Sequence, residues 1–291
     1  MNTVDMTDNN DSKQACPEIK TIELKIDYEK IEELLKNDKK LLPQFWANKY
    51  KNDASKNWDL FYKRNTTKFF KNRHWIGREF NELSFNNNEQ DSELNNKKKI
   101  VLELGCGVGN FIFPVLESNP LLFIYACDFS KRAIEFVKNH FQYDEKRCNA
   151  FVCDLTEDNL PDFISSNDKV NIVSSIFVLS AIPPEKHLNV IRNISKVTKQ
   201  GSIICFRDYA IYDETQLKFS SDGAHKLDEN LYVRQDGTMT YFFTIEYLKD
   251  LFEKDGLFQM INGEYVEKET INRAKELRVD RRFLQAKFTR L

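Results

Sequence analysis

The stretch KIVLELGCGVGN, Lys99 to Asn110, places a short apolar run directly before three glycines. These glycines follow the pattern E-x-G-x-G-x-G, which begins at Glu103. A strand that enters a glycine-rich loop and then a helix brings a polar ligand against the helix N-terminus. A dinucleotide loop would have its third glycine at Asn110, and a phosphate loop would need G-K-S/T. The spacing therefore favours a cofactor without phosphate groups, S-adenosylmethionine, with Gly105 and Gly107 as candidate contacts.

Acidic residues end the next two apolar runs, LLFIYACD and NAFVCD, at Asp128 and Asp154. A carboxylate at the end of the second strand of such a fold can accept hydrogen bonds from both ribose hydroxyls. Asp154, one strand later, would reach an adenine amino group. Either acid could instead be only a helix N-cap. Three acid-bearing strand ends in succession favour the cofactor interpretation.

Apolar runs alternate with helical patterns from about residue 100, which is typical of a parallel sheet covered by helices on both faces. VNIVSSIFVLSAI and GSIICFRDY are the fourth and fifth runs. The intervening segments predict a helix with Ser130 as its N-cap and another closed by Gly201. After Tyr209 the pattern predicts a hairpin in LYVRQDGTMTYFFT, a helix from Thr244 to Gly256 and two more strands.

The chain divides by composition into four segments. Residues 1–18 are polar and predict a disordered tail. Residues 19–85 predict a helical arm that is rich in basic and aromatic side chains. Residues 86–99 have no apolar period and predict a linker loop. Residues 100–291 then form the α/β domain, with the hairpin inserted at about 228–243.

Composition restricts the class of protein. The chain has 291 residues, 41% of them hydrophobic, and a formal charge of −2, so nucleic acid could bind only to local patches. No apolar run approaches the ~20 residues that span a bilayer, and the polar N-terminus does not read as a targeting peptide. The six cysteines form no C-x-x-C pair. We expect reduced structural thiols, no metal site, and a cytoplasmic protein, and we leave open whether it also enters the nucleus.

The residues after the fourth and fifth strands restrict which chemical group can accept the methyl group. The platform [DN]-P-P-[YFW], used for exocyclic amino groups, is absent, and neither Cys106 nor Cys205 stands where a cysteine nucleophile for carbon methylation would. A ring nitrogen such as cytosine N3 needs no general base, but its methylation creates a cation. We expect Asp208 to stabilise that charge and Phe177 to stack on the base. Alternatively, Phe177 is core and Arg207–Asp208 is a structural ion pair.

Several motifs, in order and at matching spacing, resemble the eukaryotic tRNA N3-cytidine methyltransferases from about Asn57 to the C-terminus. They are NWDLFYKRN, FFKNRHW, LELGCGVGN, ACDFSKRAIE, CDLT, IFVLSA, FRDYAIYD, YVRQDGTMTYFF and FLQAKF. The resemblance implies a class I S-adenosylmethionine-dependent methyltransferase with seven strands, the last antiparallel. It implies methylation of cytidine thirty-two in the anticodon loop, with S-adenosylhomocysteine as product. The implied cofactor contacts are Trp58, Tyr62, Gly105, Asp128, Asp154, Leu155 and Ile176.

The same resemblance bears on the partner. The motifs are most similar to the branch associated with serine tRNAs, which is thought to cooperate with seryl-tRNA synthetase. The threonine-tRNA branch stays open, as does a methyltransferase that acts on protein or on a small molecule. A non-catalytic RNA-binding protein is the alternative from another class, and the intact glycine loop argues against it. We expect a monomer that binds tRNA and no membrane.

Aromatic and cationic residues are concentrated between Asn57 and Trp75, in NWDLFYKRNTTKFFKNRHW. From Lys49 to Arg78 there are nine Lys or Arg against two Asp. RNA loops present unstacked bases and phosphates, which such residues recognise. The candidate RNA contacts are Lys63, Arg64, Lys68, Lys71, Arg73, Arg207, Arg281 and Arg282. Alternatively, the segment is an amphipathic helix with a solvated basic face.

Overall fold

The computed structural model describes residues 28–85, 98–164, 169–272 and 277–291. The tail expected at residues 1–18, and the linker expected at 86–99 up to residue 97, lie outside the described residues. Lys99 already belongs to the first strand of the domain. No helix within the described residues is long and apolar enough to cross a bilayer.

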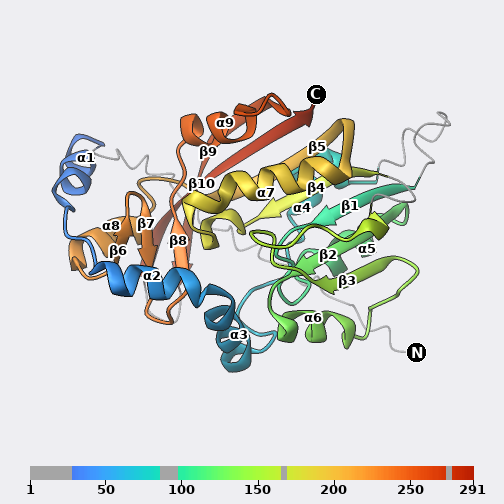
Figure 1. Cartoon of the computed structure of the whole chain (residues 1–291), viewed down its shortest axis with the longest axis horizontal. Coiled ribbons are helices and arrows are strands. Elements are labelled where there is room, and N and C mark those ends of the chain that lie inside the picture. Colours follow the sequence, from blue (N-terminus) through green and yellow to red (C-terminus); the bar gives the residue numbers. More distant parts are fainter. Residues whose placement is uncertain (1–27, 86–97, 165–168, 273–276) are drawn as a thin grey trace, which may run out of the picture.

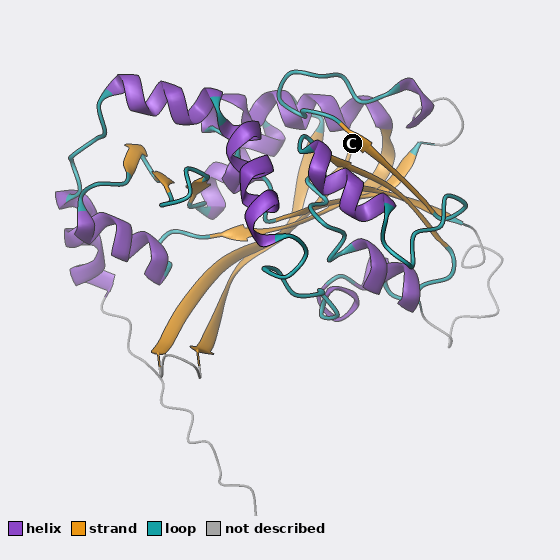
Figure 2. Cartoon of the chain, turned by 90° about the horizontal axis from the view of Figure 1, so that it is seen from below, coloured by secondary structure: helices purple, strands orange, loops and turns teal. Residues whose placement is uncertain are grey.

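A seven-stranded sheet forms the centre of the molecule (Figure 1). Its order is β3-β2-β1-β4-β5-β10-β9, in which β1 to β5 are parallel and β10 is antiparallel to both neighbours. This confirms the class I methyltransferase fold. The strands are β1 Lys99–Glu103, β2 Leu122–Asp128, β3 Cys148–Val152, β4 Val170–Ile176, β5 Thr198–Tyr209, β9 Phe258–Asn272 and β10 Leu277–Arg290. Figure 2 shows β9 and β10 running out beyond the sheet as a two-stranded extension.

Helices cover both faces of the sheet because successive strand residues point to opposite sides. In β1, Val101 joins the core under α5 and α6, whereas Leu102 joins the core under α7 and α9. Both positions are apolar, as expected for a parallel sheet buried on both faces. The helices are α5 Ile112–Ser118, α6 Lys131–Lys138, α7 Pro184–Val197 and α9 Ile245–Glu253.

Two predicted helix starts are confirmed, and one predicted helix end is wrong. Ser130 caps α6, as expected, by accepting from the backbone N–H of Ala133 at 3.2 Å. Thr244 caps α9 in the same way. The prediction that Gly201 closes the preceding helix is wrong: α7 ends at Val197, and β5 starts at Thr198 and runs through Gly201. Thr198 pairs with Val170 of β4, which starts the strand before Gly201, whereas β10 joins only from Ile203 onward. Sequence propensity cannot show such pairing.

The segments outside the sheet form two further parts. The N-terminal arm contains α1 Tyr28–Asn37, α2 Gln44–Asn52, α3 Ala54–Asn65, α4 Ile76–Glu79 and a 3-10 turn at Asn81–Leu83. The expected hairpin is formed by β7 Leu231–Val233 and β8 Met239–Tyr241. It belongs to a small sheet with β6 Lys226–Asp228, which follows α8 Glu214–Asp222. In Figure 1, α2 lies across this small sheet and α3 reaches α6 at the main domain.

Candidate active site

Two cavities meet at the glycine loop. The first, of about 320 Å³, contains Asp128, Asp154 and Glu157 in its wall, and we call it the acidic cavity. The second, of about 370 Å³, contains Trp75, Tyr209 and Phe283, and we call it the aromatic cavity. Both cavities share the residues Trp58, Tyr62, Gly105, Phe177 and Ala181. A group held in one cavity can therefore meet a group held in the other beside Gly105.

The glycine loop needs glycine for two reasons at Gly105. Its φ of 53° lies in the left-handed region, which side chains disfavour. A Cβ there would also lie 2.9 Å from both methyl groups of Val178. The loop therefore approaches the turn after β4 closely, and the floor shared by the two cavities is bare backbone.

Asp128 lies in the wall of the acidic cavity and is 5% exposed. One carboxylate oxygen accepts from the N–H of Gly107 and the other from the N–H of Ser130, each at 2.9 Å. Burial raises the pKa of Asp128 to about 6, against these two hydrogen bonds, which lower it. Because Ser130 caps the helix, capping is not the role of Asp128. Each oxygen keeps a lone pair for a ligand hydroxyl.

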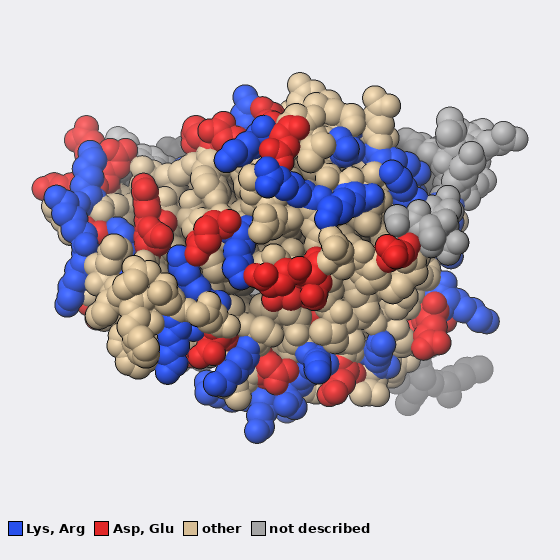
Figure 3. Space-filling model, viewed as in Figure 1, with Lys and Arg blue, Asp and Glu red and all other residues tan. Residues whose placement is uncertain are grey.

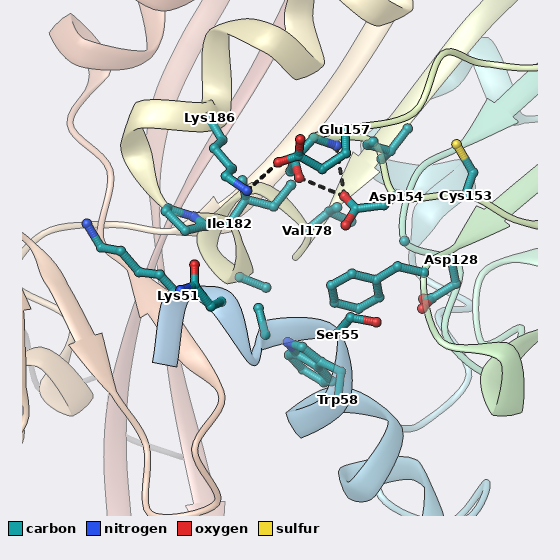
Figure 4. A pocket seen from close by; sticks show the side chains of 18 of the residues that line it. Lys51, Ser55, Trp58, Asp128, Cys153, Asp154, Glu157, Val178, Ile182 and Lys186 are labelled. Carbon is teal, nitrogen blue, oxygen red and sulfur yellow. Dashed lines mark hydrogen bonds and ion pairs between the residues drawn. The ribbon is translucent and has the colours of Figure 1, made fainter. Parts of the chain in front are cut away.

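Asp154 and its neighbours line the acidic cavity on the same side as Asp128 (Figure 4). Asp154 accepts from the backbone N–H and the hydroxyl of Thr156, at 2.9 and 2.7 Å. Leu155 is buried beside it. Lys186 forms an ion pair with Glu157 at 2.5 Å at the rim. Across the opening, Figure 4 shows Lys51, Ser55 and Trp58 on the arm.

Trp58 and Tyr62 on α3 form the wall between the cavities, with ring centroids 5.9 Å apart. The Tyr62 hydroxyl lies 2.9 Å from where a Cβ at Gly107 would stand, so α3 touches the glycine loop. Asp59 fastens α3 to α6 by accepting from the Ser130 hydroxyl at 2.9 Å. The indole nitrogen of Trp58 is buried with no hydrogen-bond partner among the described residues. It is available as a donor to a ligand.

Arg73 and Glu103 form a charged pair of groups in the aromatic cavity that the sequence did not indicate. Arg73 donates to the carbonyl of Ile176 at 2.9 Å, so it lies in the cavity wall and not at the surface with the other RNA candidates. Glu103 is 3% exposed, and its Oε2 has no hydrogen-bond partner among the described residues. Burial raises the pKa of Glu103, and the Arg73 charge lowers it. A guanidinium and a carboxyl group in the wall of one cavity match the two ends of an amino acid.

Ile176 stands apart from the other expected cofactor contacts. It ends β4, is buried in the core, and lies in the wall of neither cavity. Its backbone carbonyl contributes to the site by accepting a hydrogen bond from Arg73, which lies in the cavity wall. A hydrophobic strand end gives no sign in the sequence that its carbonyl, and not its side chain, faces the site.

Phe177 lies where the cavities join and has a φ of 59°. Its ring contacts Tyr209 and Phe283, with centroids 5.2 and 5.3 Å apart. A left-handed conformation at a bulky residue is strained and persists only where the surroundings impose it. Phe177 is therefore a cavity residue and not simply core.

Asp208 has a different position from the one expected. It is 0% exposed and lies in the wall of neither cavity. Its oxygens accept from the backbone N–H groups of Ser180 and Tyr209, each at 2.9 Å. Burial raises its pKa to about 6. Asp208 therefore holds the backbone around the aromatic cavity, and its carboxylate does not face a base bound in that cavity.

The basic candidates fall into two groups. Lys63, Arg64, Lys68 and Lys71 are exposed at and after the end of α3, and Lys71 reaches the aromatic cavity. Figure 3 shows Lys and Arg side chains along the lower edge of the molecule, near the position of α3 in Figure 1, interspersed with acids.

The arginines near the sheet edge are committed to protein partners. Arg207 is 5% exposed, lies over the rings of Trp75 and Phe283, and donates to Gln285, so its guanidinium already has protein partners and its expected contact with RNA stays a prediction. It also forms no ion pair with Asp208 within the described part of the chain. Arg281 lies in the wall of the aromatic cavity and forms an ion pair with Asp213, which lies outside that wall. Arg282 lies over the Tyr265 ring and forms an ion pair with Glu267.

Comparison with known proteins agrees with this architecture. A methyltransferase domain model matches residues 102–204. The chain is 51% identical to the tRNA N(3)-cytidine methyltransferase METTL6 of Homo sapiens, covering 88% of this chain and 87% of that protein. It is 44% identical to the tRNA N(3)-methylcytidine methyltransferase trm141 of Schizosaccharomyces pombe, covering 86% and 98%. It is also 42% identical to the tRNA N(3)-methylcytidine methyltransferase Mettl2 of Drosophila melanogaster, covering 82% of this chain and 72% of that protein.

Two solved structures share the fold. One is a SAM-dependent methyltransferase from Anabaena variabilis, with a TM-score of 0.57 and 13% identity, covering 81% of this chain and 95% of that one. The other is a SAM-dependent methyltransferase from Methanosarcina mazei, with a TM-score of 0.51 and 14% identity, covering 67% and 94%. At this identity the similarity concerns the fold alone.

Proposed function

The chain belongs to the tRNA N(3)-cytidine methyltransferase family, and from this premise we propose that it methylates N3 of cytidine thirty-two in the anticodon loop of serine tRNAs. The names of its relatives support the reaction and the tRNA substrate. One observation carries the proposal on the structural side: a polar cavity for a nucleoside and an aromatic cavity for a base share Gly105, Phe177 and Ala181 in their walls.

The site fits S-adenosylmethionine, which supplies an activated methyl group when bound. Asp128 would accept from the ribose hydroxyls, and Asp154 lies farther along the same cavity on the adenine side. Arg73 and Glu103 would bind the carboxylate and ammonium ends of the methionine moiety. The unpartnered Oε2 of Glu103 and the bare backbone at Gly105 are what such a ligand would occupy. Trp58 and Tyr62 exclude water from the junction.

The aromatic cavity suits a cytosine taken out of its stack. Phe177, Tyr209 and Phe283 provide ring faces for the base, and stacking on aromatic side chains is how unpaired RNA bases are commonly held. Extracting the base costs a few kcal/mol, least in a loop. The N3 lone pair needs no general base, so the contribution of the protein is alignment and exclusion of water. Asp208 would then act on catalysis through the backbone that it positions.

Nucleoside analysis tests the proposal. The full chain is incubated with bulk tRNA and isotopically labelled S-adenosylmethionine, with and without seryl-tRNA synthetase, and the nucleosides are measured by mass spectrometry. We expect label in 3-methylcytidine, more of it with the synthetase, and none with the Asp128→Ala variant. Label in any other nucleoside would contradict the proposed reaction.

Purified serine and threonine tRNAs then separate the two substrate classes. A preference for threonine tRNA in the same assay would contradict the serine assignment and leave the reaction intact. Label in a protein fraction instead of tRNA would favour the protein-acceptor alternative.

A further inference from the structure

The turn between β7 and β8 carries Arg234 into the aromatic cavity. Its backbone N–H donates to the carbonyl of Thr238 at 2.7 Å, and its carbonyl accepts from Gly237 at 2.9 Å. The side chain is half-buried and its guanidinium lies 5.4 Å from the centre of the Tyr209 ring. A cation of the inserted hairpin thus forms part of a cavity that otherwise belongs to the main sheet and the arm.

Two guanidinium groups share the Tyr209 ring, but only one has a carboxylate partner. Arg281 lies 5.2 Å from the ring centre and forms an ion pair at 2.9 Å with Asp213, which is fully buried. Arg234 forms no ion pair with any carboxylate that the structure describes. The charge of Asp208 acts on Arg234 only from a distance, since both Asp208 oxygens accept from backbone N–H groups.

The position of Arg234 is fixed from two sides. The amide of Asn57 on α3 donates to the carbonyl of Gly237 at 2.9 Å, which ties the turn to the arm. Phe243, two residues after the end of β8, donates its N–H to the carbonyl of Tyr209 at 2.9 Å, which ties the hairpin to the end of β5. The hairpin therefore delivers an uncommitted cation to a defined place, as a binding group requires.

We propose that Arg234 binds a phosphodiester oxygen adjacent to the target cytidine, an inference that rests on the proposed function. A base that enters the aromatic cavity brings its own backbone to the cavity, whose wall also contains the exposed cation Lys71. A guanidinium over an aromatic ring keeps its N–H donors free at the edge, and these donors match phosphate oxygens. Phosphate contacts of this kind position the nucleic acid.

Charge-neutral and charge-keeping variants test the contact. Arg234→Gln should weaken tRNA binding about tenfold and reduce the slope of log K against log salt by about 0.7 to 0.9, the value for one phosphate contact. Arg234→Lys should keep most of the slope. Lys249→Gln, on α9 and away from both cavities, is the matched control and should change neither quantity. S-adenosylhomocysteine affinity should stay unchanged in all three.

Modified tRNA gives a second measurement that does not depend on a variant folding. Two ligated tRNAs each carry one uncharged methylphosphonate, at the linkage before or after the target cytidine. We expect the wild-type protein to bind one of them about tenfold more weakly than unmodified tRNA, and Arg234→Gln to show no additional loss on it. The inference would be overturned if the methylphosphonate weakened tRNA binding by the same factor in the wild-type protein and in Arg234→Gln. An unaltered salt slope in Arg234→Gln would also overturn it. If the wild-type protein methylates no tRNA at all, the proposed function itself fails.

Discussion

Asp128 and Asp208 show how two carboxylates with the same pKa can serve different purposes. Burial raises the pKa of each to about 6. Asp128 faces a cavity with lone pairs to spare, whereas Asp208 is enclosed and bonded to backbone. In both cases the folded pKa lies above the ordinary value of 3.8. The ionised forms therefore destabilise the fold progressively as pH rises from about 4 to about 6.

The first prediction uses this pKa. Binding of S-adenosylhomocysteine should weaken as pH falls below about 6, approaching tenfold per pH unit, because a protonated Asp128 loses one acceptor for the ribose. Calorimetric affinities between pH 5 and pH 8 measure the effect. Asp128→Asn should bind weakly at every pH. The matched control is Asp208→Asn, which removes the other carboxylate whose pKa is about 6 and should keep the wild-type pH profile. A flat profile in that control would show that Asp208, and not Asp128, is the group whose titration affects binding.

The second prediction concerns Arg73, which lies in the cavity wall and not among the exposed cations. Arg73→Gln should lower S-adenosylhomocysteine affinity by about 10 to 100-fold, because truncating one partner of a buried charged contact costs about 2 to 5 kcal/mol, of which solvent at the cavity recovers a part. The salt slope of tRNA binding should not change. Lys71→Gln should reduce the salt slope of tRNA binding and leave the S-adenosylhomocysteine affinity unchanged. If Arg73→Gln altered only the salt slope, Arg73 would be an RNA contact after all.

Among the elements, the turn between β4 and α7 controls both cavities. It carries Phe177 and the 3-10 turn Leu179–Ala181. Asp208 holds it by accepting from Ser180, and His187 on α7 holds it by contacts of Nε2 with the carbonyls of Leu179 and Ile182 at 2.9 Å. Burial lowers the pKa of His187 to about 4, so the ring is neutral at physiological pH and Nε2–H can donate. These anchors maintain the strained backbone of Phe177.

The third prediction concerns the link between the arm and the hairpin. Asn57→Ala removes the hydrogen bond to Gly237, which should cost about 0.5 to 1.5 kcal/mol of unfolding free energy and loosen the turn that carries Arg234. We expect kcat/KM for tRNA to fall several-fold with donor affinity unchanged. Asn65→Ala is the control, since its amide also donates to one backbone carbonyl but within α3. Equal loss of kcat/KM in both variants would argue against a specific role of the link.

At the scale of the molecule, a net charge of −2 coexists with local cationic surface. Lys63, Arg64 and Lys68 are exposed on one side of the arm, close to the aromatic rings that border the cavity. Fields of exposed charges extend only about 8 to 10 Å at working salt, so the net charge does not decide whether RNA binds. The placement of the arm does.

The fourth prediction follows from that placement. Replacing Lys63, Arg64 and Lys68 together by Gln should reduce the salt slope of tRNA binding by about 2 to 3, since each phosphate contact contributes about 0.7 to 0.9. Donor affinity should not change. A second triple variant, Lys218, Lys249 and Lys254 to Gln, removes the same charge from α8 and the region of α9. A similar loss of slope in that variant would show that only total charge matters.

The fold and the acidic half of the site follow from sequence because their signals are local. Alternating apolar runs and helices define the order of elements, the glycine spacing defines the loop, and Asp128 directly ends a strand beside it. Parallel strands bring their carboxyl ends to one edge, so a chain that is read in order already places these groups together. The wrong end of α7 at Gly201 reflects the pairing of Thr198 with Val170 in β4, which the local sequence does not show.

Apart from Phe177, Trp58 and Tyr62, which the sequence already indicated, the aromatic half of the site was decided by tertiary structure. Its wall combines α3, the segment after it, the end of β5, the hairpin turn and β10, which lie far apart in the chain. Burial turned Arg207 and Arg73 inward, enclosed Asp208, and left Glu103 and Arg234 facing a cavity. Sequence reports the type of a charged side chain, but its environment comes from residues that only folding brings close. That environment determines whether the charge meets solvent, a protein partner or a ligand.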